Sequence, residues 1–178
     1  MATREVCVLR LGHRIERDER ATMHVFLTAR ALSASRVVYS GQRDASLEKR
    51  ILDVVDRWGG PFEVRYERHW RKVTQKWKQR GIVCHLTMYG ININECLDKI
   101  PEEKPILVIV GSQKVHKDAF ESADYNIAIG NQPHSEIAAL AIFLNSLFKG
   151  KELNREFKNA RMRVVPQEKG KRVIFENL

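Results

Sequence analysis

Short apolar segments alternate with amphipathic helical segments along most of the chain, and this alternation limits the folds that are open to it. The expected strands are residues 5–11, 36–41, 61–67, 81–90, 105–111 and 124–130. The expected helices are residues 24–34, 45–60, 68–80, 92–100 and 133–148, with a short helix within 112–123. A helix between two strands returns the chain to the edge of the sheet from which it left, so such strands pair in parallel. The pattern predicts an α/β fold in which helices flank a mainly parallel sheet.

Local signals support several of these boundaries. The segment "PILVIVG" (105–111) is a continuous apolar run, which predicts a buried strand. The helix that begins at residue 45 ends at Gly59 and Gly60. Residues 12–22 are dense in charge and are expected to form a loop, with Thr22 as the cap of the following helix. Near the C-terminus, residues 160–177 predict a short strand pair around a Lys-Gly turn.

Length and composition predict one soluble domain, residues 1–178. The chain is 43% hydrophobic and 30% charged, which is typical of a globular protein. No apolar run approaches the ~20 residues that span a bilayer, and the N-terminal segment lacks the apolar core of an export signal. We therefore expect a cytoplasmic protein with no membrane partner. Cys7, Cys84 and Cys96 are dispersed and show no zinc-site spacing, so no metal is expected.

Positive charge is both in excess and clustered. There are 31 Lys and Arg residues against 22 Asp and Glu, a net charge of +9, which favours a polyanionic partner such as nucleic acid. One cluster follows the first strand and contains Arg10, Arg14, Arg17 and Arg20. A second cluster, residues 65–80, interleaves cations with aromatic residues, as phosphate contacts and base stacking would require. The alternative for residues 65–80 is a solvated amphipathic helix whose tryptophans face the core.

Glycine-containing loops follow the late strands, at the edge of the sheet where α/β proteins bind ligands. They are "IVGSQKV" (109–115), "AIGNQPHSE" (128–136) and a third candidate, "HLTMYG" (85–90). Glycine allows the backbone of such a loop to approach a ligand closely. None of the three matches a dinucleotide-binding or phosphate-loop fingerprint. The alternative for residues 129–136 is a turn followed by a helix cap.

The same loops carry a resemblance to a known family. The segments "ILVIVGSQKV" and "ADYNIAIGNQPHSEIAALAIFL" resemble the C-terminal half of the SPOUT methyltransferases. Together, "VLRLGHRIERD", "RWGGPF", "HLTMYG" and "IGNQPHSE" resemble, over almost the whole chain, the archaeal family that methylates the ribose 2'-hydroxyl of cytidine 56 in the tRNA T-loop. The resemblance implies a SPOUT-type fold with a C-terminal trefoil knot, S-adenosyl-L-methionine as cofactor, tRNA as partner and a homodimer in which the helix 137–148 takes part.

The resemblance also implies which residues form the site. The cofactor pocket is expected from Leu86, Gly111, Ser112, Gln113, Lys114, Val115, Ile129, Gly130, Asn131, Gln132, Pro133, His134, Ser135 and Glu136. Related ribose methyltransferases place an asparagine six residues before an arginine on the first helix, and that spacing selects His24 and Arg30 as catalytic residues. The alternative for Arg30 is an ordinary arginine on the helix surface.

Two further assignments accompany the resemblance. Arg14, Arg17 and Arg20 are expected to bind RNA phosphates, against the alternative of a solvated charge cluster. His134 and Glu136 are both candidates for the proton path, and the general base stays unassigned. The rival functions are base methylation by the same fold and non-catalytic RNA binding on the same scaffold. Phosphate-cradling nucleotide binding is disfavoured because the chain lacks the glycine-rich lysine loop.

Overall fold

The computed structural model describes residues 4–111 and 115–176, and its centre is a six-stranded parallel sheet. The strands are β1 (Val6–His13), β2 (Arg36–Gly41), β3 (Glu63–Tyr66), β4 (Ile82–Asn92), β5 (Ile106–Val110) and β6 (Tyr125–Ala128). Their order across the sheet is β3-β2-β1-β5-β4-β6, and every neighbouring pair is parallel. The predicted α/β architecture is confirmed.

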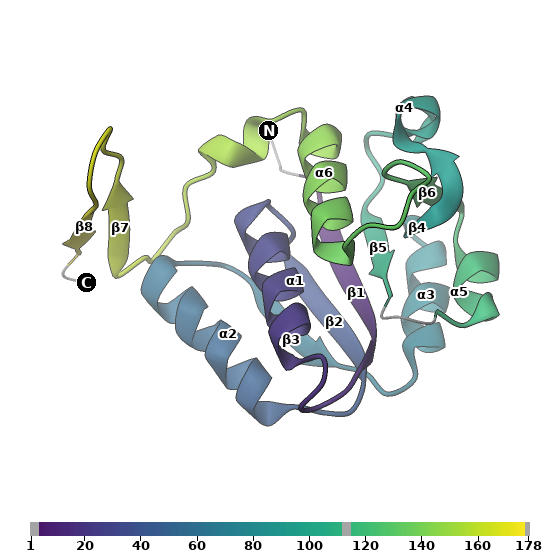
Figure 1. The fold of residues 1–178 in the computed structure, drawn as a ribbon, viewed down its shortest axis with the longest axis horizontal. Helices are drawn as coiled ribbons and strands as arrows, with labels where there is room; N and C mark the ends of the chain where they lie inside the picture. Colours follow the sequence, from purple (N-terminus) through teal and green to yellow (C-terminus); the bar gives the residue numbers. More distant parts are fainter. Residues whose placement is uncertain (1–3, 112–114, 177–178) are drawn as a thin grey trace.

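Helices cover both faces of this sheet (Figure 1). The helices are α1 (Glu19–Ala31), α2 (Ala45–Trp58), α3 (Trp70–Lys78), α4 (Ile93–Cys96), α5 (Lys117–Ser122) and α6 (Glu136–Phe148), with two 3-10 turns, η1 (Leu97–Lys99) and η2 (Lys151–Asn154). The helices α1, α2 and α6 pack on one face, while α3 and α5 pack on the other.

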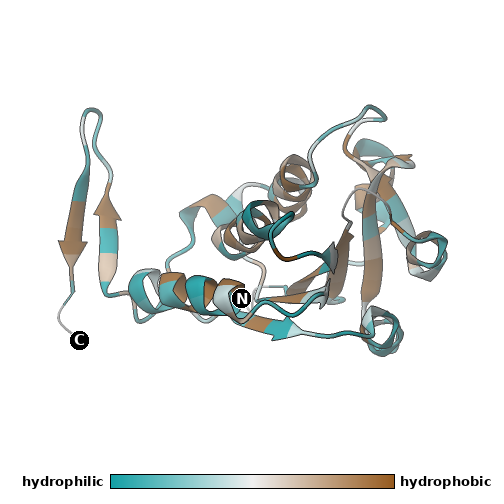
Figure 2. Cartoon of the chain, turned by 60° about the horizontal axis from the view of Figure 1, so that its bottom comes forward, coloured by the Kyte–Doolittle hydropathy of each residue, from teal (hydrophilic) through white to brown (hydrophobic). Residues whose placement is uncertain are grey.

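Alternation along each strand divides the core into two layers, because successive side chains point to opposite faces. On β1, Val6 and Val8 pack toward α1 and α6, whereas Cys7 and Leu9 pack toward α3 and α5. Since β1 and β5 are buried on both faces, they read as continuous apolar runs. Figure 2 shows these central strands as mainly hydrophobic.

The two predicted C-terminal strands form a separate antiparallel hairpin. Its strands are β7 (Met162–Val165) and β8 (Arg172–Phe175), and they pair with each other and not with the main sheet. The hairpin projects away from the sheet in both Figure 1 and Figure 2, and its base lies next to the end of α2. A bridge between Gly60 and Lys158 ties the preceding segment to the end of α2.

The first helix begins earlier than its apolar pattern predicts. It starts at Glu19 with Asp18 as its N-cap position, so the charged residues up to 22 are only partly a loop. Thr22 is a buried residue inside the helix, where its Oγ1 lies 2.9 Å from Nδ1 of His13. The prediction of Thr22 as the helix cap was wrong, because the first turn of α1 is charged and lacks the apolar spacing by which a helix is recognised.

Two later boundaries also shift. The segment 85–90 belongs to a long strand, β4, whose pairing with β6 is interrupted between Leu86 and Ile91. The last long helix, α6, begins at Glu136, so Pro133 lies before its first turn. Ser135 is its N-cap, and the Ile137 amide donates to the Ser135 hydroxyl at 3.1 Å. The expectation that Pro133 opens the helix was therefore wrong, whereas capping by Ser135 is confirmed.

Candidate functional site

A cavity of about 850 Å³ opens at the carboxyl edge of the sheet, where β1, β4 and β5 end. The strand β4 contributes His85, Leu86, Thr87, Met88 and Tyr89. Gly111 and Val115 come from the segment after β5, and Pro133, His134 and Glu136 come from the segment after β6. This position follows from parallel topology, which brings the loops after several strands to one edge. Its volume lies within the range of small-molecule sites.

The structure brings part of the predicted cofactor set together at this cavity. The residues that line it are Leu86, Gly111, Val115, Pro133, His134 and Glu136. Asn131 instead ties the 130–135 loop to β4, since its Nδ2 donates to the carbonyls of Met88 (2.8 Å) and Gly90 (3.0 Å). Ile129 packs against the core, Ser135 caps α6, and Gly130 and Gln132 complete the loop. Ser112, Gln113 and Lys114 lie outside the described residues.

The cavity also has lining residues that sequence reasoning did not select. Arg10 of β1 is 1% exposed; one of its Nη atoms donates to the Gly111 carbonyl, and the other lies 3.2 Å from Oε1 of Glu136. Burial lowers the pKa of this guanidinium, and the Glu136 carboxylate opposes that shift. Arg10 therefore joins the segments after β5 and β6. The sequence signal was a lone arginine inside an apolar strand, where a buried charge needs a partner.

His85 is a second unpredicted residue at the cavity. It is fully buried, its Nδ1 lies 2.9 Å from Oδ1 of Asn126, and its ring meets Phe120 edge-on at 4.7 Å. Because Nδ2 of Asn126 donates to the Phe120 carbonyl, Oδ1 faces His85 and accepts the proton on Nδ1. Nε2 then carries a lone pair, and it has no hydrogen-bond partner among the described residues. Burial lowers the pKa of His85, which keeps the ring neutral.

The charged loop after β1 stands at the rim, where Asp18 and Ala21 line the cavity. The Arg14 side chain binds the Asp18 carboxylate through two hydrogen bonds of 2.6 and 2.8 Å, and this interaction lowers the pKa of Asp18. Arg17 and Arg20 are exposed. Of the three arginines expected to bind RNA, Arg14 is thus partly engaged within the protein.

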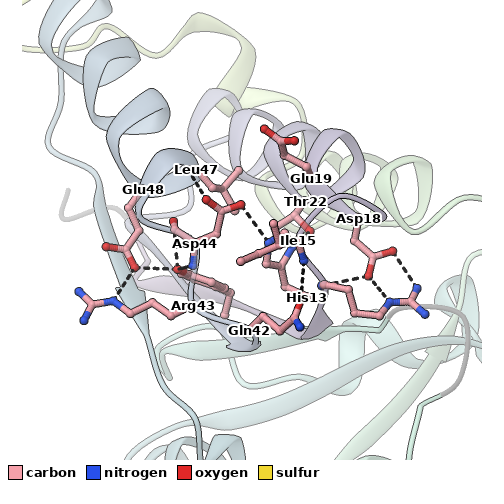
Figure 3. Close-up of polar contacts among 12 residues, drawn as sticks. His13, Ile15, Asp18, Glu19, Thr22, Gln42, Arg43, Asp44, Leu47 and Glu48 are labelled. Atoms are coloured by element: carbon pink, nitrogen blue, oxygen red, sulfur yellow. Dashed lines mark hydrogen bonds and ion pairs between the residues drawn. The ribbon is translucent and has the colours of Figure 1, made fainter.

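A buried polar network holds this loop in place (Figure 3). His13 lies between Thr22 of α1, at 2.9 Å, and Asp44, at 3.3 Å. Asp44 caps α2 through a 2.9 Å hydrogen bond from the Leu47 amide. The Tyr39 hydroxyl accepts from the Asp44 amide at 3.0 Å and donates to Glu48 at 2.6 Å. These contacts connect the starts of two helices to the ends of β1 and β2.

Arg30 and His24 do not meet at the cavity. Arg30 lies in the last turn of α1, whereas the cavity touches the start of that helix. Its Nη2 donates to the carbonyls of Trp58 and Gly59, both at 2.7 Å, and its guanidinium stacks on Phe157. His24 is exposed, and six residues of helix turn it about 120° away from Arg30. Through these contacts the Arg30 side chain anchors the end of α2, and its expected catalytic role stays a prediction.

Two features are absent from the described residues. None of the helices is both long and apolar enough to cross a membrane. No group of three or more His, Cys, Asp or Glu side chains in the described part of the chain is arranged to hold a metal ion.

Comparison with known proteins gives the family. A family model described as "tRNA ribose 2'-O-methyltransferase, aTrm56" matches residues 58–174. A relative from Methanopyrus kandleri, named tRNA (cytidine(56)-2'-O)-methyltransferase, is 57% identical over 93% of this chain and 94% of its own length. A relative of the same name from Methanocaldococcus jannaschii is 55% identical over 95% of this chain and 96% of its own. The chain belongs to this family.

Solved structures agree on the fold of this tRNA ribose 2'-O-methyltransferase family member. The TrmH/SpoU tRNA-modifying enzyme of A. aeolicus superposes with a TM-score of 0.65 at 16% identity, covering 84% of this chain and 77% of its own. The SpoU methyltransferase AviRb of Streptomyces viridochromogenes, solved with AdoMet, gives a TM-score of 0.60 at 13% identity, covering 83% of this chain and 59% of its own. The SPOUT-type fold is confirmed, while the trefoil knot stays a prediction.

Proposed function

We propose that this chain transfers the methyl group of S-adenosyl-L-methionine to the ribose 2'-hydroxyl of cytidine 56 in the T-loop of archaeal tRNA. The observation that carries the proposal is identity of 45–57% with curated relatives of that name, over 93–95% of this chain. The cavity at the carboxyl edge supplies a place for the reaction.

The lining of the cavity fits the proposed cofactor. Leu86, Met88 and Val115 offer apolar contacts to an adenine ring, and Gly111 leaves no side chain between backbone and ligand. A Cβ on Gly111 would collide with Cγ2 of Val115, so a larger residue at this position would displace that side chain. The Glu136 carboxylate is a polar acceptor at the same cavity. When bound, S-adenosyl-L-methionine supplies an electrophilic methyl group, while the protein supplies orientation and proton removal.

Among the lining side chains, His134 is the group we assign to proton removal. The carboxylates of Asp18 and Glu136 are each engaged by an arginine, Arg14 and Arg10 respectively. His134 is exposed in the loop and makes no ion pair within the described residues. Histidine is the side chain most often used as a general base, and this one is accessible to a ribose. Arg17 and Arg20, exposed beside the cavity, are proposed to hold the neighbouring RNA phosphates.

The proposal is tested with unmodified archaeal tRNA transcript and methyl-labelled S-adenosyl-L-methionine. Nuclease digestion and mass spectrometry should locate one labelled 2'-O-methylcytidine at position 56. The variant His134→Gln should lose about 10²-fold or more in kcat at saturating cofactor, the scale of general base catalysis. Label on a base would instead favour base methylation. Cofactor binding without transfer to any tRNA would favour the non-catalytic RNA-binding reading.

A further inference from the structure

A second hollow, of about 260 Å³, lies between α3 and the outer half of the sheet. Its floor comes from β2 and β3, through Arg36, Val38 and Arg65 among others. Its wall comes from α3, through Lys72, Lys76 and Trp77, with Arg80 just after that helix. We call this hollow the α3 groove. It lies on the opposite face of the sheet from α1 and α2.

The floor of the α3 groove is polar where the rest of this sheet face is apolar. Cys7, Leu9 and Leu107 of the inner strands are buried beneath α3 and α5. On the outer strands, Arg36 pairs in register with Glu63, and Val38 pairs with Arg65. Glu63 and Arg65 side chains are 69% and 71% exposed. Covering these charged side chains with an apolar helix would bury them without partners, which is unfavourable. This half of the sheet face is therefore suited to a polar partner.

The charge of the groove is positive and only partly neutralised. Its lining contains five cations and two carboxylates. The arginines have partners: Arg36 and Arg80 lie 3.4 and 2.7 Å from Glu5, and Arg65 lies 3.8 Å from Glu67. In the part of the chain that the structure describes, Lys72 and Lys76 have no carboxylate within 4.0 Å, and both are exposed. They stand one helical turn apart on α3, and so present two ammonium groups along one line.

The groove is within reach of an RNA that occupies the cavity. The helix α3 follows β3 and starts at the carboxyl edge of the sheet. Its Arg71 forms an ion pair with Asp118 of α5, and Asp118 lies three residues after Val115, which lines the cavity. From β3 to β5 there are three strand spacings, on the order of 15 Å. A folded RNA helix is wider than this distance. A tRNA whose T-loop enters the cavity can therefore lay its backbone across the start of α3.

We propose that the α3 groove is a second tRNA site, in which Lys72 and Lys76 neutralise backbone phosphates outside the nucleotide that is methylated. The inference rests on the proposed function for the identity of the RNA. Phosphate contacts of this kind give affinity and orientation without reading sequence. The stacked Arg80–Trp77 pair, 4.1 Å apart, fixes the far wall of the groove.

The test compares two double variants that remove the same charge. Lys72→Ala/Lys76→Ala empties the groove of its unpaired cations. Lys99→Ala/Lys104→Ala removes two exposed lysines that precede the central strand β5 and do not line the groove, and serves as the matched control. The Kd of each protein for unmodified tRNA is measured from 50 to 300 mM salt, alongside kcat and KM for methylation and the Kd for S-adenosyl-L-methionine. Thermal unfolding verifies that all three proteins are folded.

The groove variant should bind tRNA about tenfold more weakly than the control, and its log Kd should depend on log salt with a slope smaller by about 1.5–2. Its KM should rise, while kcat at saturating tRNA and cofactor affinity stay unchanged. Equal tRNA affinity and equal salt slope in the two variants would overturn the inference. A further outcome is that the wild type binds tRNA through Lys72 and Lys76 and yet places no methyl group on cytidine 56. That result would support the α3 groove as a tRNA site and would overturn the proposed function.

Discussion

At the scale of single residues, the most unusual group is the neutral, buried ring of His85. Burial lowers its pKa below the ordinary 6.5, so in acid the unfolded chain binds a proton that the folded chain does not. The contribution of His85 to the free energy of unfolding is therefore fully present above pH 6.5, and it is lost as the pH falls below that value. The loss cannot exceed ~1.4 kcal/mol per pH unit for one proton.

We predict that His85→Gln, which cannot titrate, flattens this dependence. The free energy of unfolding, measured with a denaturant between pH 7.5 and 5.0, should fall more steeply for the wild type than for the variant. The variant's lower stability at pH 7.5 is not the readout, because lost packing against Phe120 also contributes to it. Parallel curves for the two proteins would show that His85 titrates normally in the folded state.

At the scale of the elements, the His13–Asp44 network decides how the rim of the cavity is held. Asp44 is 6% exposed, caps α2 and is the partner of His13. We predict that Asp44→Ala costs about 1–2 kcal/mol for the lost cap. A further 1–3 kcal/mol is expected for the buried imidazole left without its acceptor. Asp44→Asn keeps an acceptor for the Leu47 amide, and should lose less.

Chemical denaturation of both variants checks this prediction. If Asp44→Ala and Asp44→Asn lose the same stability, then the cap adds nothing and the charge alone is responsible. If neither loses more than about 0.5 kcal/mol, the network does not hold the two helices, since that value is typical of a neutral surface substitution.

The elements themselves were largely predictable, and the misses share a physical cause. The apolar runs of β1 and β5 predicted strands that are buried on both faces of the sheet. The start of α1 was predicted too late because its first residues, Glu19 and Arg20, are charged and do not contribute to the apolar helical pattern. The start of α6 was predicted too early, at Pro133, whereas Ser135 is its N-cap.

The candidate site was predicted less completely than the fold. The resemblance selected loop residues, and six of those expected for the cofactor line the cavity. It also selected Arg30, whose catalytic role stays a prediction, because a spacing of six does not say which face or which end of a helix meets a ligand. Arg10, His85 and Asp18 were missed because they act through partners 126, 41 and 4 residues away in sequence: Glu136, Asn126 and Arg14.

At the scale of the whole molecule, the exposed face of α1 and α6 is the surface on which an oligomer would form. The helices lie side by side on one face of the sheet (Figure 1). On α6, Ala138, Ile142 and Asn145 are exposed at helical spacing, and Ile142 is 48% exposed. An exposed isoleucine flanked by small, uncharged side chains on one helix face is suited to a self-complementary, two-fold interface. We propose that two copies pair through this face.

The substitution Ile142→Arg tests the homodimer with a matched control. Two desolvated guanidinium groups would face each other across a two-fold axis, so the variant should lose the dimer. Leu52→Arg makes the same change at a side chain that is 49% exposed on the neighbouring helix α2, outside the surface formed by α1 and α6, and should leave the dimer intact. Light scattering should give about 41 kDa for the wild type and the Leu52 variant, twice the chain mass of 20.6 kDa, and about 21 kDa for the Ile142 variant. A wild type of 21 kDa at micromolar concentration would rule out the dimer, and a dimeric Ile142→Arg protein would move the interface to another face.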